Sequence, residues 1–382
     1  MKDISIRSHK TILVLALVAL SLMQLIEKTR ITKWDNSLAQ KEEAMFKMKS
    51  ALHSLSKHAN QINLPIDPIN DPFETGLIGS RFSEITSGRG ALYAKLASID
   101  PHSAAVMIEL MQDAGFKKGD LVVIGMTGSF PGMNLASIIA AEVLELEVAS
   151  IASLTSSSWG ANNPDFTWLD IHSYLKEQEL ISSPILGASI GANNDIGRSL
   201  SRTGRILAQE AIERNNVQPI LLPSLEANIE ERLSLISTFE RSKGKLAKGY
   251  INIGGGIASL GSRNIDSKLN SGLVLPALSL SNHEILGVAP YFLSEGKPVI
   301  NIQNIETLFG SYGLNINDSG ALNAENTTLF AKVQYKLPVV GVSLFLLISL
   351  ITGIVILDNR KNALGTQIIP LPKENNLKPQ LS

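Results

Sequence analysis

The chain has 382 residues, enough for one large domain, or two smaller ones, with additional segments. Hydrophobic residues make up 44% and charged residues 18%, which excludes a disordered, collagen-like or coiled-coil chain. Lysine plus arginine (34) nearly balances aspartate plus glutamate (35), so the composition gives no support for nucleic-acid binding. Because cysteine is absent, disulfides, thiolate nucleophiles and cysteine-bound metals are excluded.

Two apolar segments frame the chain. The first predicts a transmembrane signal anchor at residues 11–27, because basic residues precede it and no small-x-small cleavage pattern follows. The second, at residues 337–357, carries no charge. The alternatives are a cleaved signal peptide and a buried core helix, respectively. The flanks on the terminal sides are richer in lysine and arginine, which predicts cytoplasmic termini (1–10 and 358–382). We therefore expect a two-pass protein of the cytoplasmic (inner) membrane with an extracytoplasmic domain.

Between these segments we expect a stalk and a globular domain. Residues 28–62 place apolar side chains at helical spacing among many charges, which predicts an amphipathic helical stalk. In residues 63–334, apolar strands recur about every 30 residues with helical stretches between them. This rhythm predicts an α/β domain with a largely parallel sheet and helices on both faces. Residues 263–319 are polar and irregular and can form a separate subdomain.

Ligands of open parallel sheets bind beyond the carboxyl ends of the strands, so four glycine- and serine-rich turns are candidate sites. The first holds Thr127, Gly128, Ser129 and Asn134, between an apolar strand and a helix whose free N–H groups favour an anion. The alternative is a tight turn with Asn134 as the helix cap. Neither GxxxxGK[ST] nor GxGxxG is present, so no nucleotide cofactor is predicted.

The second turn holds two of the three tryptophans among hydroxyl and amide side chains, a composition suited to a pocket wall. For Trp168, packing is the simpler interpretation. The candidate ligand-binding residues of this turn are Ser158, Trp159, Gly160, Asn162 and Asp170.

The third turn, residues 187–191, matches G-x-S-x-G between a strand and a helix, the context of a nucleophile elbow with Ser189 as nucleophile. A hydrolase triad would also need a histidine, and His283 alone follows Ser189 in the sequence. In a chain rich in glycine and serine, a chance match is the alternative. Asp195, just beyond, is a candidate ligand residue or a helix cap.

Arginines and glycines complete the candidate set. Arg198, Arg202 and Arg205 have i, i+4 and i+7 spacing, which predicts one cationic helix face able to bind carboxylates. A solvated face paired with nearby glutamates is the alternative. Gly254 and Gly255 form the fourth turn and allow a ligand to approach the backbone. The six histidines are scattered, so no metal site is predicted.

Several short strings follow one another in a fixed order along the chain. They are residues 71–79 (DPFETGLIG) with 85–86, 128–131 (GSFP) with Asn134, 158–162 (SWGAN), 166–170 (FTWLD), 188–191 (ASIG) with Asp195 and Gly197, and 204–205 (GR). Together these strings resemble the family of poly-gamma-glutamate system proteins, membrane proteins found beside the enzymes that make and export poly-gamma-glutamate. One departure is Ala192, where the pattern leads us to expect a second glycine.

The resemblance implies a membrane-anchored accessory component for synthesis or export of this surface polymer, as in a capsule. Its expected partners are poly-gamma-glutamate, or its synthase and export membrane proteins, and the lipid bilayer, with no nucleic acid. The resemblance implies no reaction. The alternative function is a membrane-tethered serine hydrolase or transferase acting on gamma-glutamyl or similar amide bonds, with Ser129 or Ser189 as its catalytic residue.

Overall fold

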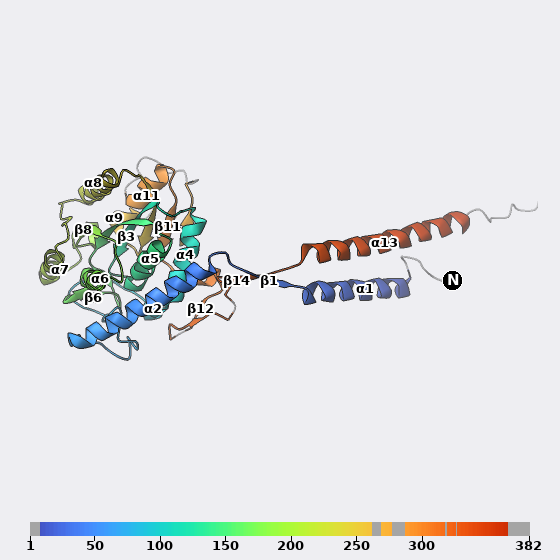
Figure 1. Ribbon diagram of the computed structural model, residues 1–382, viewed down its shortest axis with the longest axis horizontal. Helices are drawn as coiled ribbons and strands as arrows, with labels where there is room; N and C mark the ends of the chain where they lie inside the picture. The colour runs from blue at the N-terminus through green and yellow to red at the C-terminus, as the bar shows by residue number, and fades with distance from the viewer. Residues whose placement is uncertain (1–7, 262–268, 277–286, 318, 326, 366–382) are drawn as a thin grey trace, which may run out of the picture. The chain divides into compact units, whose positions relative to one another are not determined.

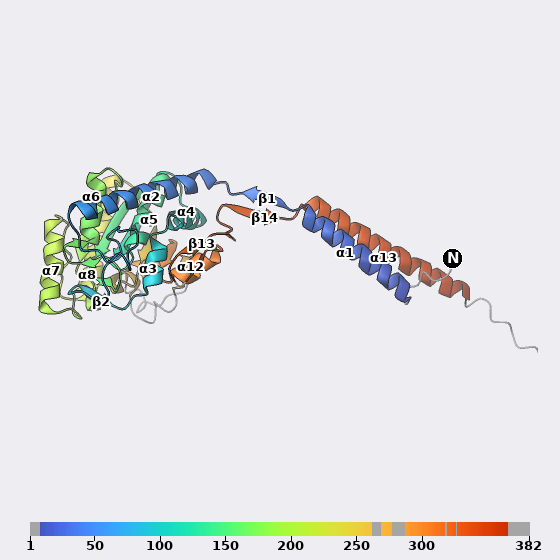
Figure 2. The same ribbon diagram turned by 90° about the horizontal axis from the view of Figure 1, so that it is seen from below.

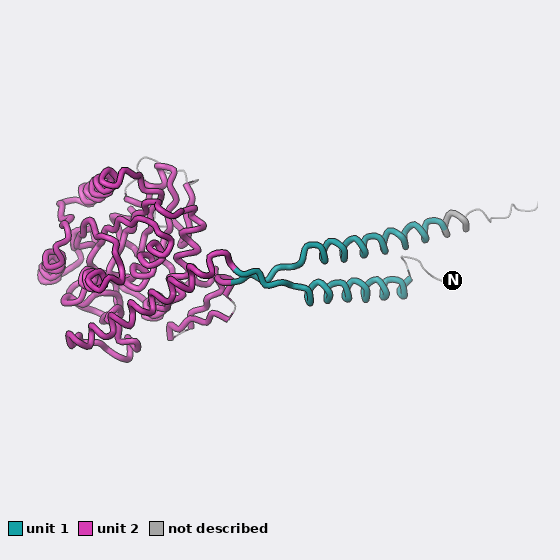
Figure 3. Tube along the Cα trace, in the orientation of Figure 1, with its two compact units in different colours: residues 1–34, 331–382 teal, residues 35–330 magenta. Residues whose placement is uncertain are grey.

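The computed structural model describes residues 8–261, 269–276, 287–317, 319–325 and 327–365. It divides into two units, one of residues 1–34 and 331–382 and one of residues 35–330 (Figure 3). The terminal segments expected to be cytoplasmic lie largely outside the described residues.

The first unit is built from both ends of the chain. Helices α1 (His9–Lys28) and α13 (Leu337–Gly365) pack side by side (Figures 1 and 2). Strands β1 (Ile31–Trp34) and β14 (Ala331–Gln334) pair antiparallel, with Trp34 opposite Ala331. Both helices are long and apolar enough to cross a membrane, and almost all of their apolar stretches are exposed. Length and composition are thus consistent with the two expected membrane segments.

The second unit contains a six-stranded, mostly parallel sheet, which confirms the α/β prediction. The antiparallel edge strand is β10. The other five strands run parallel because helical connections return the chain to the same end of the sheet. In spatial order the strands are β10 (Gly272–Val274), β11 (Val299–Ile302), β9 (Ala247–Ile253), β3 (Leu121–Thr127), β4 (Glu147–Ser153) and β8 (Ile185–Ser189).

Helices cover both faces of this sheet, as expected. Alternate residues of β3 enter two different cores, with Val122 and Ile124 in one and Leu121 and Val123 in the other. The first core receives α2 (Leu38–Gln61), α4 (His102–Asp113), α5 (Pro131–Val143) and α6 (Trp168–Glu177). The second receives α8 (Leu225–Lys243), α9 (Ile257–Leu260) and α11 (Val288–Ser294).

Helix α2 differs from the stalk expected at residues 28–62. Its apolar stripe, which includes Met48 and Leu55, is buried against α4 and α5, and residues 28–34 belong to the other unit. Lys41 is also buried, where its Nζ donates to the Leu329 carbonyl at 2.7 Å and forms an ion pair with Glu109. Helix α2 is therefore an outer helix of the α/β domain.

The sheet reverses its order between β3 and β9. From β3 the chain proceeds to β4 and β8 on one side, whereas β9 and β11 lie on the other side of β3. Connections diverge at such a reversal and leave a crevice at the carboxyl ends of the strands. The described parts of residues 263–319 include β10 and β11, which extend the same sheet, so they form no separate subdomain.

The remaining elements of the second unit lie outside the six-stranded sheet. They are β2 (Thr86–Gly88) paired with β5 (Ser156–Ser157), β6 (Asn162–Asn163) paired with β7 (Phe166–Thr167), β12 (Asn315–Ile316) paired with β13 (Leu322–Asn323), α3 (Leu92–Ser98), η1 (Asn193–Asp195), α7 (Arg202–Arg214) and α12 (Ile305–Ser311).

Candidate functional site

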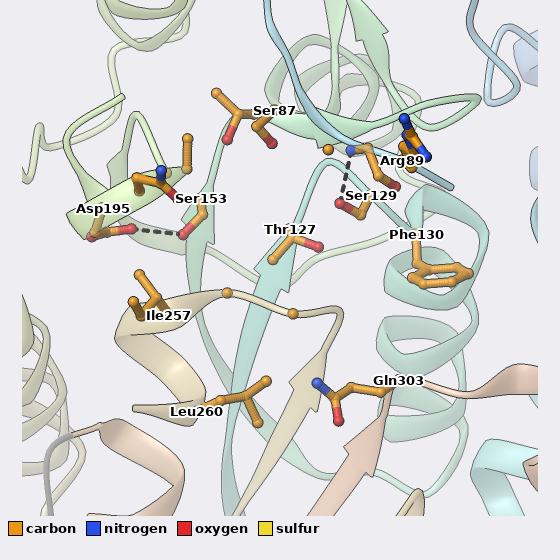
Figure 4. Close-up of a pocket in the computed structure, with 18 of the residues that line it drawn as sticks. Ser87, Arg89, Thr127, Ser129, Phe130, Ser153, Asp195, Ile257, Leu260 and Gln303 are labelled. Atoms are coloured by element: carbon orange, nitrogen blue, oxygen red, sulfur yellow. Dashed lines mark hydrogen bonds between the residues drawn. The ribbon is translucent and has the colours of Figure 1, made fainter. Parts of the chain in front are cut away.

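A cavity of about 470 Å³ lies at the reversal, at the carboxyl ends of the parallel strands (Figure 4). Each of the five parallel strands contributes a turn to it, and β2 with the residue after it closes one side. Of the residues expected from the sequence, Thr127, Ser129, Asp195 and Gly255 line the cavity. The lining also contains Ser87, Arg89, Phe130, Ser153, Thr155, Ser157, Gly256 and Gln303.

The floor is formed where β3 and β9 meet. The hydroxyl of Thr127 donates to the Ile253 carbonyl at 3.1 Å. Gly254 has φ +87°, and a Cβ there would lie 2.2 Å from Thr127 Oγ1, so this position requires glycine. A Cβ at Gly255 would have no neighbour within 4 Å. Gly254 thus shapes the turn, and Gly255 opens it to the cavity.

A buried lysine that sequence reasoning missed lies behind one wall. Lys95 of α3 donates from Nζ to the Ser129 carbonyl and, at 3.0 Å, to Ser157 Oγ. The same Nζ lies 3.4 Å from the centre of the Phe130 ring. Burial lowers the pKa of Lys95 to about 7, because the charged form loses its hydration. In addition, the Ser157 N–H donates to Ser129 Oγ at 3.0 Å, so the amine is joined to both cavity serines, to the hydroxyl of Ser157 and to the carbonyl of Ser129.

A second buried group joins the ends of β4 and β8. Ser189 Oγ donates to Asp195 Oδ1 at 2.8 Å and accepts from Arg232 Nη2 at 2.6 Å. Arg232 forms an ion pair with Asp195 at 2.8 Å and also reaches Ser153 Oγ at 3.1 Å. Asp195 therefore lines the cavity as a carboxylate whose charge is balanced by Arg232. Arg232 comes from α8, and no motif in the sequence points to it.

The nucleophile elbow expected at Ser189 takes a different form. Ser189 is fully buried at the end of β8, and it is not in the cavity lining. The chain continues into η1 before the next α-helix, which starts at Arg202 and is capped by Ser201, not by Asp195. His283 lies outside the described residues.

Asn162, expected as a ligand residue, serves the turn itself. Its Nδ2 donates to the Ser80 carbonyl at 2.8 Å and to Thr86 Oγ1 at 2.9 Å. Its Oδ1 accepts from the Ser80 N–H at 2.9 Å. These bonds tie the segment before β2 to the turn after β4.

Ser158, Trp159 and Gly160 lie behind the cavity wall. Ser158 Oγ donates to the Gly88 carbonyl at 3.3 Å, and the half-buried Trp159 packs against the first core at φ +66°. A Cβ at Gly160 would lie 2.5 Å from the Gly128 carbonyl, so the two turns touch through their glycines. Gly128, Ser158, Trp159 and Gly160 are all outside the cavity lining.

Asp170 holds the start of helix α6, and Asn134 holds the end of strand β3. Asp170 forms a capping box with Thr167 and an ion pair with Arg214 at 2.6 Å, which lowers the pKa of its carboxyl against the opposing effect of burial. Helix α5 starts at Pro131, so Asn134 lies inside it and is not its cap. Its Nδ2 donates to the Thr127 carbonyl at 2.9 Å, which fixes the end of β3.

The prediction that Arg198, Arg202 and Arg205 share one helix face was wrong. Helix α7 begins at Arg202, and Arg198 lies in the turn before it because Gly197, at φ +71°, interrupts the helical pattern. Arg205 Nη1 donates to the Leu200 carbonyl at 2.8 Å and closes that turn. None of the three arginines lines the cavity.

The charge of the cavity comes from Arg89. Its side chain is exposed, and it enters none of the ion pairs found among the described residues. Since Asp195 is neutralised by Arg232, the guanidinium of Arg89 leaves the cavity with an excess of positive charge. Hydroxyls of Ser87, Thr155 and other lining residues add hydrogen-bonding groups. This environment suits a small anionic or carboxylate-bearing ligand.

Comparison with known proteins adds little to this description. No family model and no curated protein matches the chain. A solved structure of O-ureido-L-serine synthase is similar over 61% of this chain and 72% of that one, with 12% identity and a TM-score of 0.16, too slight a likeness to carry an argument.

Proposed function

We propose that this chain is a membrane-anchored accessory component of poly-gamma-glutamate synthesis or export, and that its cavity binds a gamma-glutamyl segment of the polymer. The observation that carries the proposal is the cavity at the sheet reversal, with Arg89 free of ion pairs among the described residues. The polymer presents a row of carboxylates, and a guanidinium binds a carboxylate through two parallel N–H bonds. The resemblance of the turn sequences to the poly-gamma-glutamate system family supplies the choice of polymer.

The two apolar helices, which are long enough to cross a membrane, support a membrane location. We place α1 and α13 across the cytoplasmic membrane and the α/β domain on its outer side, beside the synthase or export proteins. This arrangement would put the α/β domain on the side of the membrane to which the polymer is exported. A reporter enzyme that is active on one side only, fused after Lys336, tests it; activity on the cytoplasmic side contradicts the placement.

Binding is tested with the full chain in detergent micelles and a fluorescent gamma-glutamyl oligomer. We expect saturable binding that salt weakens, because exposed charges are screened. A neutral gamma-glutamyl oligomer, in which every free alpha-carboxylate is replaced by a carboxamide, should not compete. Arg89→Gln should weaken binding about tenfold, equivalent to about 1.4 kcal/mol for one charged hydrogen bond.

The matched control is Arg81→Gln. Arg81 is also exposed and lies in the same stretch of chain before α3, but it faces the Phe82 ring and is not in the cavity lining. This variant should bind as the wild type does. Absence of saturable binding, or equal weakening by both substitutions, would contradict the proposal.

A further inference from the structure

The hydroxyl of Ser157 faces both the cavity and a buried amine. Ser157 Oγ lies 3.0 Å from Lys95 Nζ, and Ser157 is part of the cavity lining. A serine becomes a nucleophile when a neighbouring base can take its proton, and serine–lysine pairs are one known form of this arrangement. The geometry required for such a pair is therefore present at the edge of the cavity.

The surroundings of Lys95 favour the neutral amine. The side chain is buried, and burial, with no carboxylate among the causes, holds its pKa at about 7. A neutral amine has two N–H donors and one lone pair. It can donate to the Ser129 carbonyl while the lone pair accepts the Ser157 hydroxyl, so the contacts already present suit a general base.

The backbone at Gly90 also holds the pair in place. A Cβ at Gly90 would lie 2.9 Å from Ser157 Oγ and 3.1 Å from the Cε of Lys95, so the backbone of residue 90 packs directly against both side chains. Ser157 belongs to β5, whose partner β2 leads into Gly90. Two short parallel strands thereby fix the position of the hydroxyl.

We propose that Ser157 and Lys95 form a catalytic pair that cleaves or transfers an amide bond of a ligand bound in the cavity. The pair rests on the contacts and burial of its own two residues, whereas its gamma-glutamyl substrate rests on the proposed function. Ser129, the residue expected from the sequence, serves instead to position the pair, through its carbonyl to Lys95 and its hydroxyl to the Ser157 N–H.

The chemistry balances with water or an amine as the second reactant. Ser157 Oγ bonds to the amide carbon as its proton passes to Lys95 Nζ. The tetrahedral intermediate then breaks its C–N bond, and the Lys95 ammonium returns the proton to the leaving amine. Water or a second amine attacks the resulting ester and gives its proton to Lys95, which passes it to Ser157 Oγ as the C–O bond breaks. Hydrolysis or transfer of the acyl group results.

The test uses the full chain in detergent micelles and a fluorophosphonate probe, with the labelled residue located by peptide mass spectrometry. We expect one label, on Ser157. Labelling should be lost in Ser157→Ala and slowed about a hundredfold or more in Lys95→Met, which removes the base but keeps a side chain of similar length.

Lys297→Met is the matched control, since Lys297 also lies near a phenylalanine ring, 5.2 Å from the centre of Phe292, but outside the cavity lining. It should label at the wild-type rate. No label, a label on another serine, or an undiminished rate in Lys95→Met would overturn the pair. The site of labelling in the wild type decides the matter even if Lys95→Met fails to fold.

Polymer binding on the same preparations separates the two proposals. Binding without labelling of Ser157 overturns the catalytic pair and leaves the proposed function in place. Labelling of Ser157 without binding of the gamma-glutamyl oligomer supports the pair and overturns the proposed ligand.

Discussion

Lys95 gives the domain a stability that depends on pH. Its pKa falls from 10.5 to about 7 on burial, so between these values the unfolded chain binds a proton that the folded chain releases. The penalty for burying the charge is fully present below pH 7 and disappears as pH rises towards 10.5. Within that window the free energy of unfolding rises by up to about 1.4 kcal/mol per pH unit, or about 2 to 3 kcal/mol between pH 7.5 and 9.5.

Lys95→Met isolates this effect, since all other titrating groups are shared with the wild type. Urea unfolding of the full chain in detergent, followed by the fluorescence of the fully buried Trp168, gives the free energy of unfolding at each pH. We expect the gap between variant and wild type to change by about 2 to 3 kcal/mol over this range, with the wild type gaining as pH rises. A gap that stays constant would refute a neutral Lys95.

The remaining predictions concern the cavity turns. Ala192 has φ +61° and ψ −157°, a region that almost only glycine occupies, so Ala192→Gly should raise the free energy of unfolding by about 1 kcal/mol or more; a lower melting temperature would contradict this. Arg232→Met should cost about 3 to 5 kcal/mol in urea unfolding because Asp195 is left buried and unpaired, and a loss below 1 kcal/mol would contradict it. Gly254→Ala should lower the melting temperature, whereas Gly255→Ala should leave it unchanged; equal effects would refute the assignment of the two glycines.

The fold was predictable where apolar runs are long. The sequences of β3 and β4 are buried over nearly their whole length, so they read as central strands of a parallel sheet. Helix α2 was predicted as a helix. Its stripe of small apolar residues, however, does not distinguish a separate stalk from a helix that packs on the α/β domain. Its packing depends on α4 and α5, which come later in the chain.

The site was predictable only in its turns. Glycine and serine after a buried strand identify a carboxyl end, which is how Thr127, Ser129, Asp195 and Gly255 could be found. Lys95 and Arg232 could not, because a buried cation looks like any surface lysine or arginine until the fold removes it from water. Likewise, G-x-S-x-G at Ser189 gives no information about the guanidinium and carboxylate that surround it. The family resemblance and the polymer remain predictions.

The pairing of β1 with β14 makes the α/β domain an insertion within a helical hairpin. Trp34 and Ala331 are partners across two strands, and inside the domain the Asp35 N–H donates to the Phe330 carbonyl at 2.8 Å, so its entry and exit points coincide. Domains whose ends meet tolerate excision, transplantation and circular permutation. A two-residue Asn-Gly turn could replace residues 35–330 and close β1 and β14 into a β-hairpin. The helix pair with β1 and β14 could therefore carry another domain in place of this one, provided that the termini of that domain lie equally close together.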